Sequence, residues 1–108
     1  MGGKDENNDR KISAAINPTD VNGLYRVSLT VESTNKDKPL IEGDTVLFSL
    51  HNTFPDPYRF VNIINGTAKL EIVSYGSFTV GAYVYNDKTE LELDLSQIPN
   101  APSDFKEN

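Results

Sequence analysis

Two short segments of the chain hold the residues most suited to binding chemistry. The first, the histidine loop (Leu50–Pro57), contains the single histidine of the protein with a threonine, a phenylalanine and two prolines. The second, the tyrosine loop (Ser74–Phe78), places a tyrosine directly before a glycine. We take these two loops as the candidate functional site.

The prolines make the histidine loop stiff. Phe54 precedes Pro55 and Asp56 precedes Pro57, and a residue before proline is biased towards extended backbone, while each proline lacks an N–H donor. A stiff loop that holds the Phe54 ring outward is better suited to gripping a partner than to turning the chain. The plainer alternative is that His51 caps a turn at the end of a strand.

Tyr75 differs from the other tyrosines in its surroundings. Tyr25, Tyr83 and Tyr85 lie inside alternating patterns and are predicted to pack within strands. Tyr75 instead lies between strands beside Gly76, where the missing side chain lets another group approach closely. Tyr75 and Gly76 are therefore the candidate binding residues of this loop.

The sequence disfavours catalysis and metal binding. A nucleophilic triad needs a base that is bonded to an activated hydroxyl and oriented by a third group. His51 could lie near Thr53 or Ser74, but no nucleophile-elbow sequence accompanies them. One histidine with scattered carboxylates does not define a metal site, and no glycine-rich phosphate loop is present. We predict no enzyme activity, no metal and no cofactor.

Composition and charge narrow the class of partner. The formal net charge is -6 and the pI about 4.6, which disfavours nucleic acid and anionic membranes because phosphate-rich partners need a basic footprint. A basic partner segment would be attracted instead. Cysteine is absent and no apolar run approaches the roughly 18 residues of a membrane helix. We expect a cytoplasmic protein that binds protein or peptide.

The pattern along the chain predicts one domain. Residues 1–10 are polar and unpatterned, which indicates a disordered tail or a cloning remnant and hints at a domain cut from a longer protein. Residues 11–105 are predicted to form a single β-sandwich domain. A chain of this length buries roughly 65% of the surface that its unfolded form exposes, so one core suffices.

Alternation of apolar and polar residues predicts an all-β fold. We expect strands at 11–16, 25–32, 45–50, 59–64, 67–73, 78–85 and 90–95, with a short edge piece at 40–41. Asn65-Gly66 is a strong hairpin signal, because both residues tolerate positive φ. Parity places Leu50 on the core face and His51 off it. Phe78 begins a core-facing set and is predicted to be structural, and Phe105 is predicted to dock from an extended tail.

At these two loops the sequence resembles the YEATS domain family, most closely its prokaryotic branch. The first signature is a histidine, a small hydroxyl residue, Phe-Pro, a further proline and a basic residue, matched by His51, Thr53, Phe54-Pro55, Pro57 and Arg59. The second signature, glycine-aromatic-small-x-Phe leading into a strand, is matched by Ser74–Phe78, with Ser74 in place of the usual glycine. The likeness covers roughly Val46 to Phe105.

The resemblance implies an immunoglobulin-like antiparallel sandwich of about seven or eight strands and a non-enzymatic protein-interaction module that recognises acylated lysine. By resemblance, Phe54 and Tyr75 form the walls of an aromatic slot that His51 lines. The Thr53 hydroxyl and the Tyr75 backbone N–H donate to the acyl carbonyl, beside Gly76, where a missing side chain lets another group approach closely. Acylation removes the lysine charge, so an aromatic channel accepts a side chain that it rejects as an ammonium.

A structural role is the alternative. In that reading the domain pairs with another chain through an exposed sheet edge, or docks a neighbouring signalling or effector domain, and the slot is not used.

Overall fold

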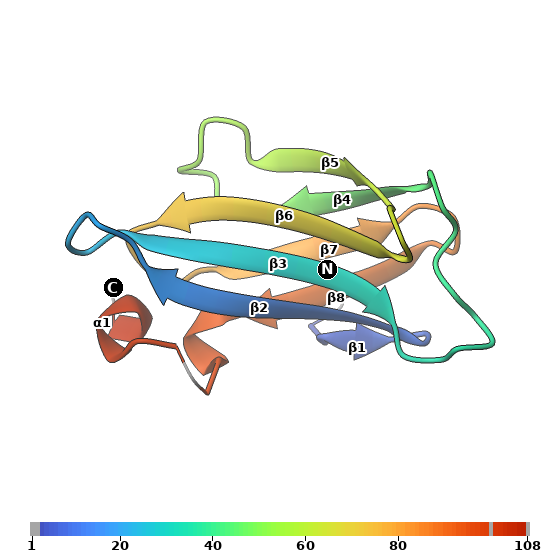
Figure 1. The fold of residues 1–108 in the computed structure, drawn as a ribbon, viewed down its shortest axis with the longest axis horizontal. Coiled ribbons are helices and arrows are strands. Elements are labelled where there is room, and N and C mark those ends of the chain that lie inside the picture. Colours follow the sequence, from blue (N-terminus) through green and yellow to red (C-terminus); the bar gives the residue numbers. More distant parts are fainter. Residues whose placement is uncertain (1–2, 100, 108) are drawn as a thin grey trace.

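The computed structural model describes residues 3–99 and 101–107 and shows the antiparallel β-sandwich that the alternation predicts (Figure 1). One sheet has the order β1-β2-β3-β6 and the other the order β5-β4-β7-β8. The elements are β1 (Glu6–Asn7), β2 (Arg10–Pro18), β3 (Tyr25–Ser33), β4 (Thr45–Ser49), β5 (Tyr58–Asn62), β6 (Thr67–Ser74), β7 (Thr79–Val84), β8 (Thr89–Asp94), the 3-10 helix η1 (Leu95–Gln97) and α1 (Ser103–Glu107). The seven main strands begin and end within two residues of the predicted bounds. No helix in the described part is long and apolar enough to cross a membrane.

The core lies between the two sheets and follows the alternation strand by strand. In β3 the odd-numbered residues Val27, Leu29 and Val31 are buried, and their register partners on β6 include the buried Ile72 and Ala68. Burying a side chain of this size contributes roughly 1.5–3 kcal/mol. The buried residues of central strands such as β3 therefore stabilise the packing of the two sheets.

Strand parity in β4 sets the direction of the histidine loop. Phe48 and Leu50 are buried, whereas His51, one residue further on, is exposed as predicted. The Leu50 N–H donates to the Pro57 carbonyl at 2.7 Å, which joins the two ends of the loop. The loop therefore projects from the end of the sandwich with its base held by backbone pairing.

The predicted Asn65-Gly66 hairpin is present. Both residues have positive φ, 53° and 78°, and both N–H groups donate to the carboxylate of Glu42, at 3.0 and 2.5 Å. The predicted edge piece at 40–41 is wrong, because Leu40 is buried in the core in a segment without strand pairing and Ile41 is exposed. The residues before β4 instead bring Glu42 to the hairpin turn.

Part of the N-terminal segment lies in the first sheet, where a disordered tail was predicted. β1 pairs with β2, and a turn with positive φ at Asn8 and Asp9 joins them. Arg10 is buried; its Nε donates to the Asp87 carboxylate at 2.8 Å, and its Nη1 donates to the Lys38 carbonyl. A guanidinium that finds a carboxylate and a carbonyl can be buried, which the polar composition of this segment did not reveal. Residues 1–2 lie outside the described part.

The C-terminal segment docks through Phe105, as predicted, but it is helical and not extended. The Phe105 side chain is fully buried, and its ring meets the Tyr25 ring edge-on with centroids 5.4 Å apart. The Ser77 N–H donates to the Phe105 carbonyl at 3.0 Å, and the Ser77 hydroxyl to the Lys106 carbonyl at 3.2 Å. Helix α1 therefore supports the tyrosine loop from beneath.

Candidate functional site

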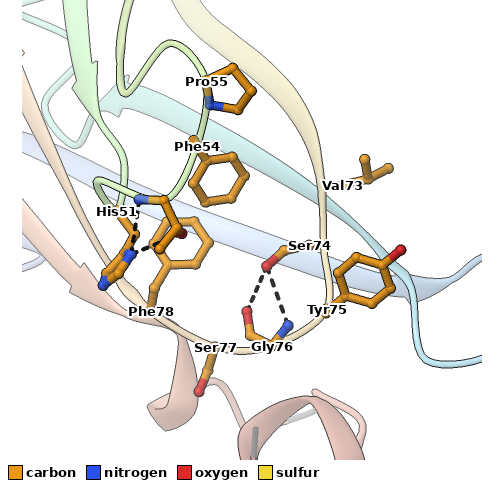
Figure 2. A pocket seen from close by; sticks show the side chains of 10 residues that line it. His51, Phe54, Pro55, Val73, Ser74, Tyr75, Gly76, Ser77 and Phe78 are labelled. Atoms are coloured by element: carbon orange, nitrogen blue, oxygen red, sulfur yellow. Dashed lines mark hydrogen bonds between the residues drawn. The ribbon is translucent and has the colours of Figure 1, made fainter.

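The histidine loop and the tyrosine loop meet at the end of the sandwich that also carries α1, and together they line one pocket of about 490 Å³ (Figures 1 and 2). A cavity of this size falls in the range of small-ligand sites. The lining residues are His51, Thr53, Phe54, Pro55, Val73, Ser74, Tyr75, Gly76, Ser77 and Phe78. The five residues predicted for the site, His51, Thr53, Phe54, Tyr75 and Gly76, are thus brought to one pocket.

Phe54 is half-buried, although the sequence suggested an outward ring. Its ring packs against Phe78 with centroids 5.1 Å apart and planes inclined at 57° (Figure 2). Both rings also contact the core. Phe78, which the sequence assigned to structure, therefore serves the core and lines the pocket at once. The sequence did not predict that Phe78 lines the pocket, because its position at the start of a core-facing set indicated only a structural role.

Tyr75 is the exposed aromatic residue of the pocket, with 68% of its surface accessible. Figure 2 shows its ring and that of Phe54 on different sides of the Ser74 side chain. The Ser74 hydroxyl accepts from the Gly76 N–H at 3.3 Å and donates to the Gly76 carbonyl at 2.7 Å. This local turn shapes the loop and directs Tyr75 towards solvent.

His51 and Thr53 form a hydrogen-bonded pair at the other side of the pocket. The Thr53 backbone N–H donates to His51 Nδ1 at 3.3 Å, and Thr53 Oγ1 lies 2.9 Å from the same nitrogen. Because a backbone N–H can only donate, Nδ1 accepts and the ring proton lies on Nε2. The Thr53 hydroxyl then donates to Nδ1, so Oγ1 keeps its lone pairs for another partner.

The pocket lining contains no fully charged side chain. It is made of aromatic, small and hydroxyl-bearing residues with one imidazole, and no Asp, Glu, Lys or Arg is among them. A bare ammonium would therefore lose its water without gaining a carboxylate, which is costly. The arrangement favours a flat, neutral group that can exchange one or two hydrogen bonds.

Comparison with known families identifies the domain. The family model described as the prokaryotic YEATS domain matches residues 25–96, two thirds of the chain. This chain belongs to the YEATS family. The matched range contains both loops of the pocket and ends before α1. No curated protein matches the chain.

YEATS domains are typically protein-interaction modules that bind proteins or peptides, and they are generally non-enzymatic. The family match therefore agrees with the protein-binding role that the sequence favoured. In this YEATS domain the pocket between the two loops is the candidate place for such a partner, since loops at the end of a sandwich are positioned by a rigid scaffold.

Proposed function

We propose that this YEATS domain binds a peptide whose lysine side chain is acylated, and that the pocket between the histidine and tyrosine loops holds the acyl-amide. The observation that carries the proposal is the uncharged aromatic pocket beside a hydroxyl whose proton is already directed to an imidazole. Acylation makes the end of a lysine side chain flat and neutral, which suits such a lining.

The hydrogen bonds of the pocket suggest how the amide is oriented. An acyl-amide offers one N–H donor and one carbonyl acceptor. The family resemblance assigned the Thr53 hydroxyl to the carbonyl, but its hydrogen bond to His51 leaves lone pairs, so Thr53 Oγ1 is better placed to accept the amide N–H. The family resemblance assigns the Tyr75 backbone N–H to the carbonyl.

Removal of the Thr53 hydroxyl tests this proposal. Thr53→Val is expected to weaken binding of an Nε-acetyl-lysine peptide about tenfold, because the amide N–H loses its acceptor, whereas Thr53→Ser retains most of the affinity. The measurement is isothermal titration together with backbone amide shifts of His51, Thr53, Phe54 and Tyr75. Thr30→Val, on the outer side of β3, is the matched control.

Two results would contradict the proposal. One is that millimolar acetyl-lysine or crotonyl-lysine peptide leaves the amide shifts of both loops unmoved. The other is that the unacylated peptide binds as tightly as the acylated one, since the pocket lining has no carboxylate to hold an ammonium.

A second function, assembly through a sheet edge, is favoured by the exposed face of β5. Within residues 3–99 and 101–107, β5 pairs with β4 alone. Pro57 and Ile63 bond towards the β4 side, so by alternation Tyr58, Phe60 and Asn62 direct their backbone N–H and C=O groups to the open edge.

The side chains beside this edge are aromatic. Tyr58 and Phe60 are 62% and 66% exposed, and the Phe60 ring stacks on Tyr85 with centroids 6.4 Å apart. An open edge flanked by exposed rings is a template for pairing with another strand. Tyr85, predicted to pack inside a strand, thus belongs to this surface.

A further inference from the structure

A hollow of about 440 Å³ adjoins the pocket at the margin of the sandwich between β5 and β6, and shares the walls Phe54, Pro55 and Val73 with it. The other residues of this hollow are Arg26, Arg59, Glu71 and Ile72. A second hollow between the same two strands is lined by Val61, Asn62, Ile64, Asn65, Thr67 and Lys69. We call the two together the β5–β6 groove.

The groove is positively charged although the protein is acidic. Its lining includes the three cations Arg26, Arg59 and Lys69 but the single anion Glu71, while the whole chain carries a net charge of -6. Arg26 Nε lies 3.3 Å from a Glu71 carboxylate oxygen, but both side chains are more than half exposed, so water and salt weaken this pair. The local excess of positive charge favours an anionic partner.

Arg59 is the cation best placed to contact a ligand. It is half-buried, and its Nε donates to the Asp56 carbonyl at 2.5 Å, which ties the guanidinium to the histidine loop. Within the described residues its terminal nitrogens have no hydrogen-bond or ion-pair partner. A guanidinium held at one side and open at the other presents the planar fork that matches a carboxylate.

We propose that the partner peptide carries an acidic side chain beside its acylated lysine, and that the β5–β6 groove holds this side chain with Arg59 as the main carboxylate contact. The inference rests on the proposed function, because the acyl-lysine sets where the peptide enters the groove. The net charge of the whole domain would by itself attract basic peptides, so the two effects predict opposite preferences.

The test uses one Nε-acetyl-lysine peptide in three forms, with glutamate, glutamine or lysine on both sides of the acetyl-lysine. The glutamate form is expected to bind about fivefold more tightly than the glutamine form at low salt, and the lysine form most weakly. Higher salt reduces the advantage, because exposed charges are screened. Arg59→Gln is expected to bring the glutamate and glutamine forms within about twofold of each other. Arg59→Lys retains the positive charge and is expected to keep part of the preference. It replaces Arg59→Gln as the test variant if Arg59→Gln folds poorly.

Lys36→Gln is the matched control, since it removes one positive charge from the exposed β3–β4 connection and is expected to keep the preference. Equal affinity for the glutamate and glutamine forms, or preference for the lysine form, overturns the inference. A preference that survives in Arg59→Gln overturns the role of Arg59.

Capped Nε-acetyl-lysine without flanking residues separates the two proposals. If this compound binds but the flanking residues of the peptides have no effect, only the groove assignment fails. If neither this compound nor the peptides bind, both proposals fail.

Discussion

The contact of α1 with the sandwich leads to a prediction about stability that the family match would not suggest, because α1 lies outside residues 25–96. The perturbation is Phe105→Ala. The Phe105 side chain is fully buried and meets the Tyr25 ring edge-on. The substitution would therefore remove both buried apolar surface and a ring contact and leave a cavity beneath the tyrosine loop.

The expected loss is about 4 kcal/mol of unfolding free energy, as for other fully buried phenylalanines replaced by alanine. With a urea dependence of about 1.5 kcal/mol per M, this lowers the denaturation midpoint by about 2.7 M. Phe105→Leu, which keeps most of the apolar volume, is expected to lose only about 1.5 kcal/mol. Gln97→Ala, an exposed change in the preceding 3-10 helix, serves as the control.

Equilibrium urea unfolding followed by circular dichroism measures these losses. Hydrogen exchange gives a second reading, because the Ser77 N–H that bonds to the Phe105 carbonyl should exchange faster in Phe105→Ala. If Phe105→Ala lowers the free energy of unfolding by less than about 1 kcal/mol, α1 is a dispensable appendage and the reasoning is wrong.

Two further predictions concern the β5 edge and the buried arginine. If the β5 edge supports assembly, the sedimentation coefficient of the domain rises with concentration and Phe60→Lys abolishes this rise; a protein that stays monomeric at all concentrations contradicts assembly through this edge. Asp87→Asn is expected to lower the unfolding free energy by about 2 kcal/mol in urea denaturation, because the buried Arg10 guanidinium loses its charged partner; a loss below about 0.5 kcal/mol would show that the pair contributes little.

Local patterns in the sequence were sufficient to predict the strands and the position of the two loops. Apolar residues at every second position must share one face of a strand, so alternation identified the buried side of β3 and turned His51 away from the core. Positive φ at Asn65-Gly66 follows equally from local backbone preference. The resemblance then paired the histidine and tyrosine loops, which the structure brings to one pocket.

Contacts between distant segments depended on the tertiary structure. The buried Arg10 pairs with Asp87, and the buried Phe105 packs against Tyr25, and neither partner is near in sequence. No periodicity encodes such pairs, because they depend on which strands become neighbours and where their loops end.

The same distinction applies to the candidate site. The sequence by itself determined which residue types stand at the loop tips: a histidine, a threonine, a phenylalanine and a tyrosine beside a glycine. Only the tertiary structure decided that Phe54 packs on Phe78 and that Arg59 opens into a groove. Residue type and strand parity are local properties, whereas the direction of a side chain in a loop depends on every segment packed around it.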